Sequence, residues 1–121
     1  MRKQIILILL ILLMLFSNNK EIKQEQIFLQ KENNYAVLVY LDTCLACRNT
    51  KMFLNEMEKR ENKIIYYLDF NECKFVTNHE NNLNINNYKD IYIKLVPTLL
   101  IIENKVIVNE LVGYKDIVKN Y

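Results

Sequence analysis

The sequence contains only one glycine and one proline in 121 residues, and it has neither a Gly/Ser-rich linker nor an internal repeat. A chain of this length has room for a single domain, and nothing in its composition divides it. Proline fixes the backbone angle φ, so the single proline, Pro97, marks a position where the backbone conformation is restricted. Pro97 is therefore a candidate for a structural or functional role.

The chain also lacks a strong excess of charge. Its formal net charge is +2 at neutral pH, and Lys and Arg are interspersed with Glu and Asp. Proteins that bind nucleic acid typically carry a clustered basic face. We therefore expect no nucleic-acid partner.

The N-terminus has a basic start followed by an apolar run. Met, Arg and Lys open the chain, and 12 unbroken apolar residues extend from Ile5 to Phe16. This arrangement is typical of a secretory signal, although no small-x-small cleavage site follows it. As a helix the run would cover about 18 Å, less than the ~30 Å hydrocarbon core of a membrane. We expect residues 1–19 to be a signal peptide or a short N-terminal membrane anchor rather than a buried core helix, with residues 20–121 outside the cytoplasm.

The hydrophobic pattern after residue 33 predicts alternating strands and helices. We expect strands at 35–41 and 64–70, a helix at 44–60 between them, a hairpin of strands at 99–102 and 106–112, and a short helix at 114–121. The strand–helix–strand unit makes the first two strands parallel. Weaker helical patterns cover 20–33 and 88–95. The predicted fold is α/β, with a central mixed sheet of about four strands flanked by helices and a short C-terminal helix.

Two of the few cysteines stand close together. Cys44 and Cys47 are separated by two residues where the first strand gives way to a helix, which Asp42 or Thr43 can cap. A spacing of three on a helix brings both sulfurs to one face, within bonding distance. The free N–H groups and the dipole of a helix N-terminus favour a thiolate at Cys44, whereas Cys47 lies inside the first turn. The pattern predicts a redox pair in which Cys44 attacks a substrate disulfide and Cys47 resolves the mixed disulfide.

Two other interpretations of this pair stay open. The cysteine count is odd, so the third thiol, Cys73, would remain unpaired. Cys73 and the single histidine, His79, have a spacing that could complete a zinc site of three Cys and one His with the pair. The pair could also form a static disulfide. We expect redox chemistry, no bound metal and no cofactor.

The order of elements and two motifs resemble the thioredoxin superfamily. A Cys-x-x-Cys pair opens the first helix, Val96-Pro97-Thr98 precedes the hairpin, and the resemblance covers residues 35–113. It implies a thioredoxin-like fold and disulfide exchange with protein substrates. It also implies a cis peptide bond before Pro97 and a substrate chain that pairs with the backbone of Val96. Val96, Pro97 and Thr98 would form the substrate-binding loop, next to the cysteines.

Three residues depart from the family's pattern. Thr43 stands where thioredoxins usually carry Trp, Leu38 where many carry a buried Asp, and Tyr67 where the Lys partner of that Asp would stand. The acid–base relay that assists the second cysteine is therefore missing or replaced. The Thr-Cys-x-x-Cys-Arg pattern at residues 43–48 is similar to small exported thioredoxin-like accessory proteins of bacteriocin loci.

These features predict an exported thiol–disulfide oxidoreductase. Its partners would be protein thiols and disulfides and an unidentified electron donor or acceptor. Residues 5–16 would hold it at the membrane if they are not cleaved. The alternative from a different class is a redox-inert, thioredoxin-like accessory or binding module of a secretion system, in which the cysteines would matter little.

Overall fold

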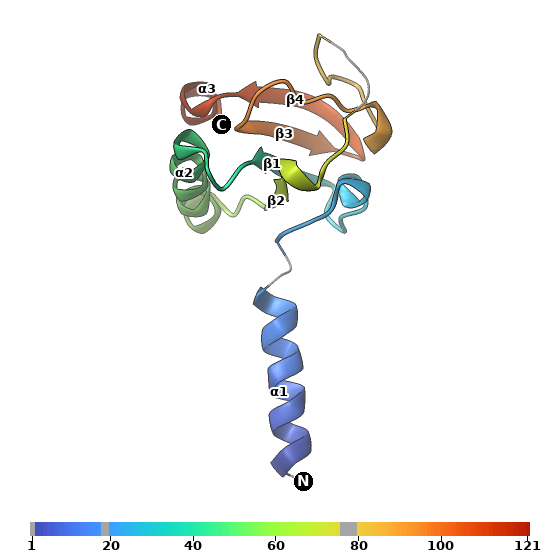
Figure 1. Ribbon diagram of the computed structural model, residues 1–121, viewed down its shortest axis with the longest axis vertical. Coiled ribbons are helices and arrows are strands. Elements are labelled where there is room, and N and C mark those ends of the chain that lie inside the picture. Colours follow the sequence, from blue (N-terminus) through green and yellow to red (C-terminus); the bar gives the residue numbers. More distant parts are fainter. Residues whose placement is uncertain (1, 18–19, 76–79) are drawn as a thin grey trace.

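The chain forms a four-stranded sheet with helices α2 and α3 together at one side of it (Figure 1). The computed structural model describes residues 2–17, 20–75 and 80–121. The helices and strands in chain order are α1 (Arg2–Ser17), β1 (Asn34–Tyr40), α2 (Leu45–Glu61), β2 (Ile65–Asp69), β3 (Thr98–Glu103), β4 (Val106–Val112) and α3 (Tyr114–Asn120). The short 3-10 helices are η1 (Gln24–Gln26), η2 (Phe70–Glu72) and η3 (Tyr88–Asp90).

The sheet is mixed and has the strand order β2-β1-β3-β4. β1 pairs in parallel with β2 and antiparallel with β3, and β4 pairs antiparallel with β3. α2 connects the two parallel strands, as the strand–helix–strand pattern predicts. The link between β3 and β4 is tight because Asn104 and Lys105 both adopt a positive φ, which a two-residue hairpin turn requires. The prediction of a mixed sheet of about four strands is confirmed.

β1 is the central strand of the core. Six of its seven residues are buried, which is why its sequence is apolar on both faces. On one face, Leu54 of α2 and Ile117 of α3 join a buried cluster with Leu38. On the other face, segments that contain no α-helix contribute Ile27 and Ile91 to a second buried cluster. The α-helices that flank the sheet therefore cover one of its two faces.

The helix predicted at 20–33 is wrong, since only the single turn η1 forms there. The carbonyl of Lys20 accepts from the N–H of Tyr67 at 2.8 Å, and the N–H of Ile22 donates to the carbonyl of Tyr67 at 2.9 Å. Glu21 thereby makes an isolated parallel bridge with β2. The backbone N–H and C=O groups that a helix would pair within itself are instead hydrogen-bonded to the edge strand of the sheet.

The helix predicted at 88–95 is also wrong, since only η3 forms. The side chain of Asn82 accepts from the N–H of Tyr92 at 2.9 Å and donates to its carbonyl at 2.8 Å. A side chain distant in sequence thus bonds to the backbone groups that would continue a helical turn.

α1 lies apart from the sheet (Figure 1). Its side chains from Ile5 to Leu9 are each more than half exposed. No helix in the described ranges is long and apolar enough to cross a membrane. The expectation that residues 1–19 form a signal peptide or short anchor stays a prediction.

Candidate active site

Cys44 and Cys47 lie at the start of α2, directly beyond the end of β1. Cys44 itself occupies the N-cap position, and its Sγ accepts a hydrogen bond from the backbone N–H of Cys47 at 3.1 Å. The expectation that Asp42 or Thr43 caps this helix is therefore wrong. The N–H of Cys44 donates to the carbonyl of Leu41 at 3.2 Å, so a turn separates the strand from the helix and moves the cap to Cys44.

The two thiols differ in burial. Cys44 is partly exposed, whereas Cys47 is 1% exposed, and both are free thiols. Burial raises the pKa of the Cys47 thiol to about 11, and its hydrogen bond with Cys44 acts in the same direction. A backbone hydrogen bond with Leu41 opposes this rise in pKa. Cys47 is therefore a buried, protonated thiol at neutral pH, and its neighbour Cys44 is the more accessible of the two.

The Val96–Pro97 loop meets the cysteines at the same edge of the sheet. β3 begins at Thr98, which pairs with Val39 near the end of β1. Val96 and Cys44 both pack against the buried cluster that contains Cys47. The structure thus brings the two motifs together, although they are 50 residues apart in the sequence.

Each residue of this loop has a distinct environment. The peptide bond between Val96 and Pro97 is cis. Val96 is partly exposed, and Pro97 is buried. Thr98 is 2% exposed, and its Oγ1 donates to the carbonyl of Leu95 at 2.6 Å, so its side chain braces the loop from inside. The carbonyl of Pro97 accepts from the N–H of Gly113 at 2.8 Å, which ties the loop to the start of α3.

Solved structures of thioredoxins share this arrangement of strands and helices. The chain aligns with a thioredoxin of Schistosoma mansoni at 21% identity, over 82% of this chain and 85% of that one, with a TM-score of 0.58. It aligns with spinach chloroplast thioredoxin f, long form, at 20% identity (79% and 75% of the two chains, TM-score 0.57). Chlamydomonas reinhardtii thioredoxin f2 aligns at 17% identity (78% and 82%, TM-score 0.54).

The chain has a thioredoxin fold. No protein-family model matches it, and no curated protein sequence does. The likeness to solved structures establishes the fold, and the chemistry rests on the residues of the site itself. The similarity to bacteriocin accessory proteins rests on the pattern at residues 43–48 alone.

Among the residues that the structure describes, no Asp or Glu side chain is buried. Leu38 is fully buried on the face that α2 covers, and it pairs in register with Tyr67 on β2. The hydroxyl of Tyr67 donates to Oδ1 of Asn55 at 3.1 Å. An apolar side chain and a neutral phenol thus occupy the two positions where the resemblance would place an Asp and its Lys partner.

Cys73 does not join the pair. It packs against the cluster on the opposite face of the sheet, and its thiol donates to the carbonyl of Asp69 at 3.3 Å. Burial raises the pKa of this thiol to about 12, and the carboxylates of Asp69 and Glu72 add to the rise. In the described ranges, no three Cys, His, Asp or Glu side chains gather as a metal site requires, and His79 lies outside those ranges.

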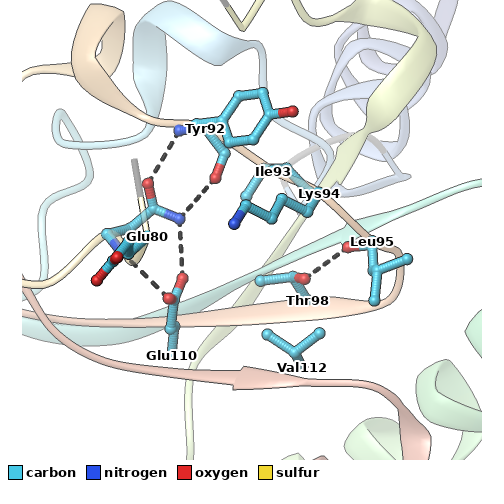
Figure 2. A pocket seen from close by; sticks show the side chains of 9 residues that line it. Glu80, Tyr92, Ile93, Lys94, Leu95, Thr98, Glu110 and Val112 are labelled. Carbon is cyan, nitrogen blue, oxygen red and sulfur yellow. Dashed lines mark hydrogen bonds between the residues drawn. The ribbon is translucent and has the colours of Figure 1, made fainter. Parts of the chain in front are cut away.

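A pocket of about 110 Å³ lies beside the loop, on the side of β4 (Figure 2). Figure 2 shows the segment from Tyr92 to Leu95 along one side and Glu110 on the strand below. Asn82 Nδ2 donates to Glu110 Oε2 at 2.8 Å and also to the carbonyl of Tyr92. Asn82 therefore fastens the segment that leads into Pro97 to the edge strand.

Two exposed apolar side chains lie next to the two motifs in the sequence, and they were not identified as site residues there. Leu45, between the two cysteines, is 68% exposed, and Leu95, directly before Val96, is 65% exposed. The sequence signal was their position next to the two motifs. Their exposure depends on the fold, because an isolated Leu is as often a core residue.

Proposed function

We propose that this protein is a thiol–disulfide oxidoreductase that acts on protein thiols and disulfides. In the reducing direction, the Cys44 thiolate attacks one sulfur of a substrate disulfide. The attacked sulfur becomes part of a mixed disulfide with Cys44. The substrate's S–S bond breaks, and its other sulfur leaves as a thiolate that takes a proton from water.

Cys47 completes the reaction. Its thiol gives its proton to water, and its sulfur attacks Cys44 Sγ. The Cys44–Cys47 disulfide forms, the bond from Cys44 to the substrate breaks, and the second substrate thiolate takes a proton. The substrate disulfide has gained two electrons and the pair has lost them. The same steps in reverse oxidise a substrate dithiol.

The observation that carries this proposal is the hydrogen bond from the N–H of Cys47 to Cys44 Sγ at 3.1 Å. It holds the sulfur of Cys44 at the N-terminus of a 17-residue helix, a position that favours negative charge. The same turn buries Cys47, so the two thiols are unequal. An attacking thiol and a resolving thiol require this inequality.

The substrate class follows from the surroundings of Cys44. Val96 is partly exposed and packs against the cluster that contains Cys47, on a loop that hydrogen bonds of Pro97 and Thr98 hold in place. Leu45, between the cysteines, and Leu95, directly before Val96, add exposed apolar surface. The substrate that fits such a surface is an extended polypeptide. Its backbone groups would pair with the backbone of Val96, and its apolar side chains would contact Leu45 and Leu95.

The proposed location is outside the cytoplasm, with α1 as export signal or short anchor. The support is the basic start and the apolar run from Ile5 to Phe16. We expect a membrane-impermeant maleimide to label Cys44 in intact cells, and Leu9→Arg to abolish most of this labelling. Labelling of Cys44 that appears only after cell lysis, to the same extent in the unaltered chain and in Leu9→Arg, would contradict export.

The enzymatic proposal is tested by trapping. Cys47→Ser removes the resolving thiol, so we expect mixed disulfides with substrate proteins to accumulate at Cys44 and to disappear on reduction. Cys44→Ser is the matched control and should trap none. Absence of trapped protein, together with no reduction of insulin by the unaltered chain, would contradict the proposal and favour a redox-inert binding module.

A further inference from the structure

Lys51 lies one helical turn after Cys47, on the same face of α2. Its side chain does not extend fully into solvent, since it is 29% exposed. Its Nζ lies 3.3 Å from the centre of the Tyr40 ring and 4.0 Å from Oε1 of Glu21. The ammonium is therefore held over the end of β1, the strand that leads into the cysteine pair.

Contacts from three parts of the chain hold this ammonium. Glu21 Oε1 also accepts from the hydroxyl of Tyr40 at 2.7 Å, and the backbone around Glu21 is bridged to Tyr67 on β2. The Tyr67 ring lies 5.5 Å from Lys51 Nζ and meets the Tyr40 ring edge-on. We call Glu21, Tyr40 and Tyr67 the lysine cage.

The lysine cage adjoins the resolving cysteine. Tyr40, Tyr67 and Cys47 belong to one buried cluster, on the face of the sheet that also contains Leu38. With Leu38 at this position, the described part of the chain contains no buried carboxylate that could take the proton of Cys47. A fixed cation beside the thiol would favour its deprotonation by a different physical route, attraction of the thiolate.

We propose that Lys51 is a positioning residue whose ammonium stabilises the thiolate of Cys47, in place of the missing acid–base relay. This role rests on the proposed function. In the reducing direction it helps Cys47 lose its proton to water and attack Cys44. In the oxidising direction it stabilises Cys47 as the leaving thiolate, because the same species forms in reverse.

The electrostatics around Cys47 agree with this geometry. Burial, as the largest cause, and the neighbouring Cys44 raise the pKa of Cys47, whereas the backbone hydrogen bond with Leu41 and, to a smaller extent, the charge of Lys51 lower it. Asp42, Asp69 and Glu21 lie near enough to raise the pKa of Tyr40 and add negative charge around the cage. Among the charged side chains that act on Cys47 in the described ranges, Lys51 is the one that favours its thiolate.

The test separates the two chemical steps. A reduced chain that carries Cys73→Ser is mixed with the aromatic disulfide dithiobis(nitrobenzoate) in a stopped-flow instrument. The first release of coloured thiol reports attack by Cys44 and speeds up with reagent concentration. The second reports attack by Cys47 on the mixed disulfide and is independent of reagent concentration.

We expect Lys51→Met to slow the second phase and leave the first within about twofold. Loss of a neighbouring charge raises a thiol pKa by about one unit, which lowers the thiolate fraction about tenfold, while intrinsic nucleophilicity recovers about threefold. The second phase should therefore slow about threefold or more, and its pH profile should move to higher pH. Lys51→Arg should restore the rate, and Lys59→Met, at an exposed position of the same helix, should change neither phase.

Two results would overturn the role of Lys51. One is a second phase that is unchanged in both Lys51→Met and Lys51→Gln. The other is an equal slowing of both phases that Lys51→Arg does not rescue, which would indicate a packing defect at the start of α2. Absence of any second phase in the parent chain would instead overturn the proposed function itself.

Discussion

Burial keeps two of the three cysteines neutral, and it does so on opposite faces of the sheet. Cys47 lies in the first turn of α2, on the buried side of that helix, and Cys73 packs against the other face of the sheet beyond β2. Folding raises the pKa of Cys47 from 9.0 to about 11 and that of Cys73 from 9.0 to about 12, with desolvation as the largest cause. Each thiol therefore binds its proton more tightly in the folded chain than in the unfolded one.

This difference makes stability depend on pH. The contribution of both thiols is complete below pH 9.0 and is lost as the pH rises toward the folded values of about 11 and 12. We expect the free energy of unfolding, measured with urea under reducing conditions, to fall as the pH rises from 9.0 to 10.0, and the buried tyrosines, whose pKa rises from 10.0 on folding, add to this fall. Cys73→Ala should make this fall shallower. A pH-independent free energy over this interval would contradict the account.

The sequence predicts the chemistry of single residues where the information is local. The spacing of Cys44 and Cys47 and the single proline, Pro97, identify the candidate site directly. The role of Lys51 was not predictable, because its surroundings depend on Glu21, which reaches the site through a bridge to β2. The cap at Cys44 was missed because Asp42 is a stronger capping residue by type, and the turn after β1 excludes it.

Among the secondary-structure elements, those with strong hydrophobic patterns were predictable within about two residues. β1, α2, β2 and the β3–β4 hairpin follow from runs of apolar residues and from turn residues. The segments at 20–33 and 88–95 were not predictable, since long-range hydrogen bonds compete with their weak helical patterns. Their irregular backbone covers the sheet face opposite α2 and delivers the chain to Pro97.

Asn82 is the residue on which the second of these segments depends. Its amide exchanges two hydrogen bonds with the backbone of Tyr92 and donates a third to Glu110, while it is 3% exposed. Asn82→Ala leaves these groups without partners, so we expect a loss of about 1–3 kcal/mol in the free energy of unfolding. Urea denaturation measures it. Asn86→Ala, at an exposed position nearby, is the control and should change stability by less than about 0.5 kcal/mol. Equal effects of the two substitutions would contradict the role of Asn82.

The molecule as a whole has a thioredoxin fold. The bridge at Glu21 stands where a longer strand could pair with the edge of β2, and α3 has only seven residues. The bridge also places Glu21, only a few residues after the end of α1, in the lysine cage. An N-terminal segment that serves export would thus continue into residues that shape the redox site.

The most direct test of the central claim is the reduction potential of the Cys44–Cys47 couple. Equilibration of the full chain with defined thiol–disulfide buffers, followed by mass analysis of the oxidised fraction, measures it. If the pair catalyses disulfide exchange, we expect a reversible two-electron couple with a reduction potential between about −270 and −120 mV. A value below about −300 mV, which is typical of structural disulfides, or the absence of any Cys44–Cys47 disulfide, would contradict the account.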